Sequence, residues 1–247
     1  MDNERLAYRR RRRRKRRLQK LIPPAVAIVL IVVIAYVGWK TGLFESFSYS
    51  TEEADLYSYF GAIADDYAVI IKNGEITTTQ LKVIDGVMYQ DLETVKELYN
   101  DRFYWDEKDR TLLYTTAEEV ISAPIDAKSN SKGTLPYTIC MEEKGKLVVA
   151  LDYVQQFAEL SYELYGGNGE PYRAVIRTQD ETVRITKVTK DQAVRVGMDK
   201  KSKILKEMKE GEELTVLADD EEGWTKVLTE DLIIGYYETR FLGDGTS

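Results

Sequence analysis

The stretch Tyr67–Tyr99, YAVIIKNGEITTTQLKVIDGVMYQDLETVKELY, decides the fold of the central part of this chain. Its pairs Asn73-Gly74 and Asp85-Gly86 are typical of two-residue hairpin turns, and runs rich in Val, Ile and Thr flank them. The pattern predicts three consecutive antiparallel strands. Apolar residues then recur at helical spacing, which predicts an amphipathic helix over residues 91–99.

A second stretch repeats this order of elements, with Leu151 in the position that Leu92 holds in the first. It contains a turn at Lys144-Gly145 and a closing hairpin around Gly166–Gly169. A polar stretch rich in Ser, Asn, Lys and Gly separates the two copies. We therefore expect two β-rich modules, each with one helix, at residues 57–125 and 137–180, with a linker at 126–136.

The order of turns, strands and helix, closed by a Tyr104-Trp105-Asp106 hairpin, resembles the domain named after the copper amine oxidase N-terminus. The resemblance implies a non-catalytic stalk module, as in bacterial cell-surface proteins. It implies no copper site here, because the chain has no histidine. Both copies take part in the resemblance, and the second is the more diverged.

The region 181–243 resembles a bacterial SH3-like domain. The segments that carry this resemblance are Ala193-Val194-Arg195, Lys209-Glu210-Gly211, Gly223-Trp224-Thr225-Lys226-Val227 and Ile234-Gly235-Tyr236-Tyr237. The sequence departs from the family after Arg195, where Val196-Gly197-Met198-Asp199 replaces the usual Ser-Gly-Pro loop. The resemblance implies a small barrel. The candidate ligand-binding residues are Trp224, Tyr236, Tyr237 and Arg195, and burial in the core is the competing interpretation of Trp224 and Tyr236.

Leu21–Trp39 is a run of 19 residues without a charge. At about 1.5 Å per residue, a helix of this length would span roughly 28 Å, close to the hydrocarbon core of a bilayer. We expect a transmembrane helix, whose anchoring residues include Leu21, Leu30, Tyr36 and Trp39, the last two near the headgroups. A buried core helix and a cleaved signal peptide are the alternatives.

Residues 1–20 hold 11 Lys and Arg against two acidic residues, whereas the remainder holds 24 basic against 40 acidic residues. Basic residues beside a membrane span stay in the cytoplasm, so Arg9, Arg14, Arg17 and Lys20 are expected to set the topology. This predicts a cytoplasmic basic tail at 1–20, a tether at 40–56 and extracytoplasmic modules beyond it. An arginine block can bind nucleic acid, but beside an apolar run the lipid bilayer is the expected partner.

Histidine is absent, which excludes Ser-His and Cys-His nucleophile pairs and histidine-based metal sites. The only cysteine, Cys140, allows no intramolecular disulfide and lies in an apolar stretch, so we expect a buried, inert thiol. Gly166-Gly167-Asn168-Gly169 lacks the Lys and Ser/Thr of a phosphate-binding loop. We expect no catalytic residues, no metal and no cofactor.

The sequence therefore predicts an α+β and all-β fold class: one N-terminal transmembrane helix, two β-rich modules, a C-terminal SH3-like small barrel and a short tail at 244–247. The expected function is a non-catalytic, single-pass envelope protein that presents the SH3-like module to peptidoglycan or another wall glycan or peptide. The alternative is the front part of a hydrolase. The order of segments resembles the N-terminal region of membrane-anchored glycoside hydrolase family 18 proteins, whose Asp-x-x-Asp-x-Asp-x-Glu motif is absent here. A third hypothesis is an ectodomain that senses a soluble ligand.

Overall fold

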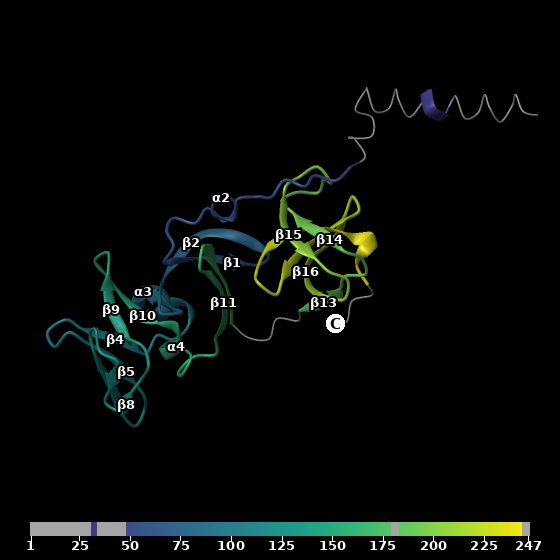
Figure 1. The fold of residues 1–247 in the computed structure, drawn as a ribbon. Helices are drawn as coiled ribbons and strands as arrows, with labels where there is room; N and C mark the ends of the chain where they lie inside the picture. The colour runs from purple at the N-terminus through teal and green to yellow at the C-terminus, as the bar shows by residue number, and fades with distance from the viewer. Residues whose placement is uncertain (1–30, 34–47, 179–182, 244–247) are drawn as a thin grey trace, which may run out of the picture. The chain divides into compact units, whose positions relative to one another are not determined.

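The computed structural model describes residues 31–33, 48–178 and 183–243. The chain divides into two units, residues 1–49 and residues 50–247, of which the second is a compact structure built mainly of β-strands. Two large sheets dominate this second unit (Figure 1). Only short helices accompany them, none longer than seven residues between positions 48 and 243 of the described chain.

The first large sheet has seven strands in the order β11-β12-β1-β2-β3-β10-β9. Its strands are β1 (Tyr67–Lys72), β2 (Glu75–Ile84), β3 (Val87–Asp91), β9 (Cys140–Glu143), β10 (Lys146–Ala150), β11 (Ser161–Gly167) and β12 (Glu170–Arg177). Positive φ angles at Asn73 (53°), Gly74 (72°), Asp85 (51°) and Gly86 (79°) make the two predicted hairpin turns, which are confirmed. Left-handed backbone at both central residues matches the twist of the flanking strands.

The predicted pair of separate modules is wrong, because the strands of the two copies form one sheet. β10 of the second copy pairs with β3 of the first, and β12 pairs in parallel with β1 on the other side. The first three strands therefore lie between strands of the second copy. A meander of three strands alone would leave both of its edges unpaired, and pairing with the second copy removes that exposure.

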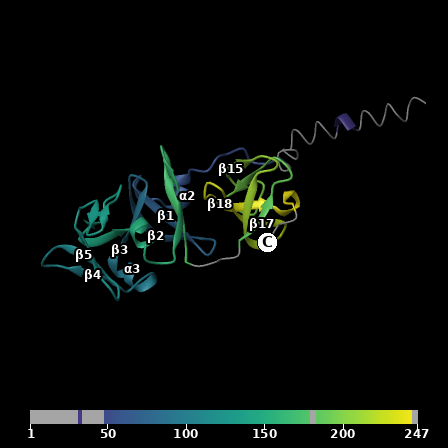
Figure 2. The same ribbon diagram turned by 90° about the horizontal axis from the view of Figure 1, so that it is seen from below.

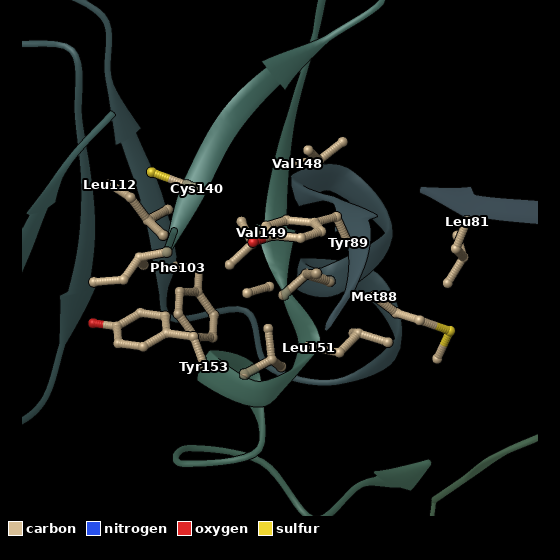
Figure 3. Close-up of a cluster of buried hydrophobic side chains, with 14 of the residues drawn as sticks. Leu81, Met88, Tyr89, Phe103, Leu112, Cys140, Val148, Val149, Leu151 and Tyr153 are labelled. Carbon is tan, nitrogen blue, oxygen red and sulfur yellow. The ribbon is translucent and has the colours of Figure 1, made fainter. Parts of the chain in front are cut away.

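One hydrophobic core serves both copies. The helices α3 (Leu92–Leu98) and α4 (Leu151–Val154) each follow a strand and contact the sheet strand of the other copy as well as their own. Asp91 starts α3 by accepting a hydrogen bond from the Thr94 N–H at 3.0 Å. Figure 3 shows core side chains from both copies, such as Met88 and Leu151, meeting between these elements.

Two small sheets complete the first half of the unit. They are made of β4 (Phe103–Asp106), β5 (Thr111–Thr115) and β6 (Val120–Pro124), and of β7 (Ser129–Asn130) and β8 (Gly133–Thr134). Phe103 of β4 and Leu112 of β5 are buried in the same core as the helices (Figure 3). The Tyr-Trp-Asp hairpin predicted from the sequence is the β4–β5 pair, in which Trp105 lies opposite Leu112.

The C-terminal sheet has six strands in the order β13-β16-β17-β18-β14-β15. Figure 2 labels three of these strands, β15, β17 and β18. Its strands are β13 (Arg184–Lys187), β14 (Gln192–Arg195), β15 (Ile204–Met208), β16 (Glu213–Glu221), β17 (Trp224–Thr229) and β18 (Ile234–Glu238), followed by a 3-10 turn, η2 (Thr239–Phe241). The predicted SH3-like small barrel is wrong, because β13 and β15 do not pair and remain the two edges of an open sheet.

Both edges are covered by neighbouring parts of the chain, which explains why the sheet does not close. At the β15 edge, Glu53 forms a parallel bridge with Ile204, and the Ile204 N–H donates to the Glu52 carbonyl at 2.8 Å. At the β13 edge, the Gly243 N–H donates to the Lys187 carbonyl at 2.8 Å. Each edge strand therefore finds hydrogen-bond partners outside the sheet, which an edge strand otherwise lacks.

A hydrophobic cluster separate from the main core joins the two large sheets. Val69 and Ile71 of β1 pack with Leu228 and Ile234 of the C-terminal sheet, and with Phe60 of α2 (Leu56–Phe60). The side chains of β1 alternate, so Ala68 and Ile70 point into the core that α3 and α4 cover. Strand β1 is thus buried on both faces.

The predicted transmembrane helix is not among the described residues. Residues 31–33 are helical, while the rest of the predicted span 21–39 lies outside the part of the chain that the structure describes. Within the described residues, no helix has the length and apolar character needed to cross a bilayer. The predicted fold class is therefore wrong as a whole: the described residues form a mostly β unit of two open large sheets.

Candidate functional site

The best candidate for a binding surface lies on β17 and β18, where Trp224 and Tyr236 are both half-buried. The strand register pairs Trp224 with Glu238 and Lys226 with Tyr236. The two rings are therefore diagonal neighbours on one face of the sheet, a separation that aromatic side chains can bridge. We call Trp224 and Tyr236 the aromatic pair.

The rest of this sheet face is covered by the first half of the unit. Lys226, which lies opposite Tyr236 in the register, forms an ion pair with Glu75 at the start of β2. The Tyr59 hydroxyl donates to the Ile234 carbonyl at 2.8 Å, and burial together with nearby Tyr236 raises the pKa of Tyr59 to about 12. The aromatic pair therefore lies at the margin of a contact, with its rings only partly covered.

The other two predicted ligand-binding residues have structural roles. Tyr237 follows Tyr236 directly, so its ring points to the opposite face, where it is fully buried and donates a hydrogen bond to the Lys190 carbonyl at 2.7 Å. Burial is the main cause that raises the pKa of Tyr237. A ligand on the aromatic pair cannot reach this ring.

Arg195 pairs with Tyr236 in the strand register but is only 2% exposed. Its Nη1 donates to the carbonyls of Ser202 at 2.7 Å and Ser50 at 3.1 Å. The guanidinium thus fastens the segment before α2 to the C-terminal sheet. Arg195 was predicted as a ligand-binding residue, and the structure places its guanidinium in a buried position against the carbonyls of residues 50 and 202.

Sequence reasoning missed a buried arginine that joins the two sheets. Arg173 of β12 is fully buried, and its Nε donates to the Asp231 carbonyl at 2.7 Å in the turn between β17 and β18. Its Nη1 donates to the Pro171 carbonyl at 3.1 Å, and its Nη2 donates to the Glu170 carboxylate at 2.9 Å. An arginine at an inward position of a strand was the only signal in the sequence.

The Asp231 carboxylate completes this cluster. It lies 2.7 Å from the Lys206 Nζ and 3.8 Å from the Arg173 Nη2. Burial acts to raise the pKa of Asp231, but hydrogen bonds from Lys206 and Thr229 and the charge of Arg173 outweigh it, so the pKa is lowered. The cluster links the two large sheets, and the charged groups of Arg173, Asp231 and Lys206 are engaged in that contact.

Cys140 is buried in the main core, which confirms the predicted burial (Figure 3). Its Sγ lies 3.9 Å from the Pro124 carbonyl. Burial, followed by the charge of Asp126, raises the pKa of the thiol to about 12. A thiol in this environment is protonated at neutral pH and makes a poor nucleophile.

Among the residues that the structure describes, no three His, Cys, Asp or Glu side chains gather closely enough to hold a metal ion. The predicted anchoring residues Leu21, Leu30, Tyr36 and Trp39 and the predicted topology residues Arg9, Arg14, Arg17 and Lys20 lie outside the described ranges. No protein-family model, curated protein or solved structure matches this chain.

Proposed function

We propose that this chain is a non-catalytic, membrane-attached protein of the bacterial cell envelope that binds peptidoglycan or another wall glycan or peptide through the aromatic pair. The observation that carries the proposal is the position of Trp224 and Tyr236 as diagonal, half-buried neighbours on one sheet face. Partly exposed Trp and Tyr rings supply large contact area at a low entropic cost, which suits a binding surface.

Attachment to the cell membrane is supported by the sequence at the N-terminus. The uncharged stretch Leu21–Trp39 follows a block of basic residues, and the remainder of the chain is strongly acidic. This charge asymmetry favours a cytoplasmic N-terminus and an extracytoplasmic C-terminal unit.

The hydrogen bonds of residues 50–54 limit how far the aromatic pair extends from the anchor. Ser50 donates its N–H to the Lys200 carbonyl, and the Ala54 N–H donates to the Ile204 carbonyl. Only residues 40–49 separate the uncharged stretch from this attached segment. Ten residues reach at most about 36 Å when fully extended. The proposed ligand therefore belongs to the layer of the envelope next to the membrane.

Binding is tested by co-sedimentation of the purified full chain with peptidoglycan sacculi. The double variant Trp224→Ala/Tyr236→Ala should lose most of the pelleted fraction. Tyr104→Ala is the matched control, because Tyr104 is 48% exposed on β4, away from the aromatic pair. Equal pelleting of the double variant and the control, or no pelleting of the unmodified chain, would refute this binding role.

Membrane attachment needs a separate test. The full chain and a version starting at Ser50 are produced in a bacterium, and their membranes are extracted with alkaline carbonate. We expect the full chain to stay in the pellet and the shorter one to be released. Protease added to intact spheroplasts should digest residues 50–247 of the full chain. Protection of this region would contradict the proposed orientation.

A further inference from the structure

The outer side of β11 differs from the other three edges of the two large sheets. Residues 52–54 bind β15, Gly243 binds β13, and the Asp126 N–H donates to the Cys140 carbonyl of β9 at 2.9 Å. Within the described ranges of the chain, no backbone group from outside the sheet hydrogen-bonds to Ser161–Gly167. We call this uncovered side of the strand the β11 edge.

The β11 edge also lacks the usual features that prevent a strand from pairing. Its register with β12 stays regular from Ser161 to Tyr165 and shifts only toward Gly167. The strand contains neither Lys nor Pro, the residues that commonly protect an edge. The regular stretch therefore presents a row of backbone donors and acceptors that a further strand can use.

A groove of about 460 Å³ adjoins this edge. Glu163 of β11 and Arg177 of β12 line one side of it, and residues from β13, β16 and β17 line the other. Side chains alternate along a strand, so Glu163 shares its face of the sheet with Ser161 and Tyr165. A strand added at the β11 edge would direct every second side chain toward the side of the groove.

The groove combines an apolar floor with an exposed apolar rim. Leu214, Leu228 and Leu232 line it and are buried, whereas Ile185 of β13 is 38% exposed. Ile185 lies opposite Thr215 of β16, which also lines the groove. An apolar side chain placed here would remove the exposed surface of Ile185 from water, which is favourable.

The charges around the groove leave one carboxylate without compensation. Glu163 forms an ion pair with Arg177, and the Glu213 carboxylate lies 3.5 Å from the Lys187 Nζ. Glu230, which is exposed directly after β17, has no ion-pair partner among the described residues. The groove is therefore acidic at this rim, which favours a partner with a basic side chain.

Two other occupants fit the edge and the groove less well. A second copy of the chain, paired through its own β11, would bring another Glu163 and another Glu230 to the same face, where like charges repel. A small molecule could fill the groove, but it would leave the row of backbone groups unpaired. An extended peptide uses both, because its backbone pairs with the edge and its alternate side chains enter the groove.

We propose that the β11 edge binds an extended segment of another protein, which adds a strand to the first sheet. The segment pairs with Ser161–Tyr165, places apolar side chains beside Ile185, and carries a Lys or Arg that approaches Glu230. This site is separate from the aromatic pair, because neither Trp224 nor Tyr236 lines the groove.

The test is calorimetric titration of the full chain in lipid nanodiscs with synthetic octapeptides. The basic probe is acetyl-Lys-Thr-Val-Thr-Leu-Thr-Val-Lys-amide, and its acidic counterpart carries Glu at both Lys positions. We expect the basic peptide to bind about two to five times more tightly, which is the effect of one exposed ion pair. Glu230→Gln should remove this preference. Glu207→Gln is the matched control, because Glu207 is exposed on β15 and lies outside the groove.

Backbone pairing is tested with two further versions of the basic peptide, which are N-methylated on alternate residues in one phase or the other. Alternate N–H groups of a strand point to opposite sides, so only one side of the peptide faces β11. We expect one phase of methylation to abolish binding and the other to be tolerated. This comparison uses the unmodified chain and does not depend on the folding of a variant.

The groove itself is tested with Ile185→Ser, which should weaken binding of the basic peptide about five-fold or more, because an apolar contact is lost. Ile63→Ser is the matched control, since Ile63 is 65% exposed and lies outside the groove. Denaturation midpoints verify that each variant is folded. Trp224→Ala/Tyr236→Ala should leave the affinity unchanged, which separates this site from the proposed wall-binding surface.

Three results would overturn the proposal. The first is that the basic peptide does not bind at millimolar concentration. The second is that both phases of N-methylation have the same effect, or that Ile185→Ser behaves like Ile63→Ser. The third is that the chain without peptide sediments as a dimer that Ile185→Ser dissociates, which would assign the edge to a second copy.

Discussion

Replacing Arg173 by Met should destabilise the unit strongly, although Met preserves much of the side-chain volume. The change removes three hydrogen bonds, to the Asp231 carbonyl, the Pro171 carbonyl and the Glu170 carboxylate. It also removes the guanidinium that lies 4.7 Å from the centre of the Tyr165 ring.

The magnitude follows from what is left behind. Two carbonyls lose a buried donor, at about 1–3 kcal/mol each when a group stays unsatisfied. Asp231 keeps Lys206 at 2.7 Å, and Glu170 is 47% exposed, so these two carboxylates add little. We therefore expect a loss of about 3–5 kcal/mol, in the middle of the roughly 2–6 kcal/mol that two unsatisfied carbonyls imply.

The assay is urea denaturation of the full chain in detergent, followed by tryptophan fluorescence. Trp105 reports on β4 and Trp224 on β17, so the fluorescence signal reports on the first half of the unit and on the C-terminal sheet. With a slope of about 1–3 kcal/mol/M, the midpoint should fall by at least about 1 M. Arg177→Met is the control on the same strand as Arg173, since Arg177 pairs with the exposed Glu163 of β11 and its replacement should cost less than about 1 kcal/mol. Equal midpoints for Arg173→Met and Arg177→Met would refute the reasoning.

The remaining predictions concern Asp231, Gly235 and Cys140. The lowered pKa of Asp231 means that its ionised form contributes stability above the unfolded pKa of 3.8, and this contribution is lost as the pH falls through the lower folded value. Asp231→Asn should therefore flatten the acid side of the stability profile measured by denaturation between pH 2 and 5, and an unchanged slope would contradict the assignment. Gly235→Ala should lose about 1–3 kcal/mol or more, because a Cβ there would lie 2.7 Å from the Arg195 carbonyl oxygen. Gly133→Ala, where nothing lies within 4 Å of the added Cβ, is the control, and the stabilities of the two variants are compared by thermal melting. Cys140 should stay unreactive toward a thiol reagent at pH 8 and react once urea unfolds the chain, because burial raises its pKa to about 12; rapid reaction of the folded chain would show that the thiol is accessible.

Local signals in the sequence predicted the hairpins well. Asn-Gly and Asp-Gly pairs specify left-handed turns by themselves, and Asp91 before an apolar helical pattern marks the start of α3. The burial of Cys140 also followed from its apolar neighbours. These features depend only on residues close together in the chain.

The sequence pattern could not predict which distant strands pair with each other. The parallel pairing of β1 with β12 joins segments about a hundred residues apart, and no local signal distinguishes it from two separate modules. The covering of the β15 edge could not be predicted either, because nothing in the sequence at Glu53 indicates a partner at Ile204. Both errors in the fold class come from contacts of this kind.

Part of the candidate site could have been excluded from the sequence alone. Tyr236 and Tyr237 are adjacent in a strand, so their side chains must lie on opposite faces, and only one of them can join Trp224. The acceptors of Arg195 could not have been foreseen, because one is a carbonyl 145 residues away.

The pairing of residues 50–54 with β15 also determines the order in which the chain can fold. This contact closes a loop of about 150 residues, so it can form only after the residues of β15 have been synthesised. Closing such a loop costs about 4 kcal/mol of chain entropy, and contacts of this sequence separation slow folding. Residues 50–54 therefore lack their β15 partner until residues 204–208 have been synthesised.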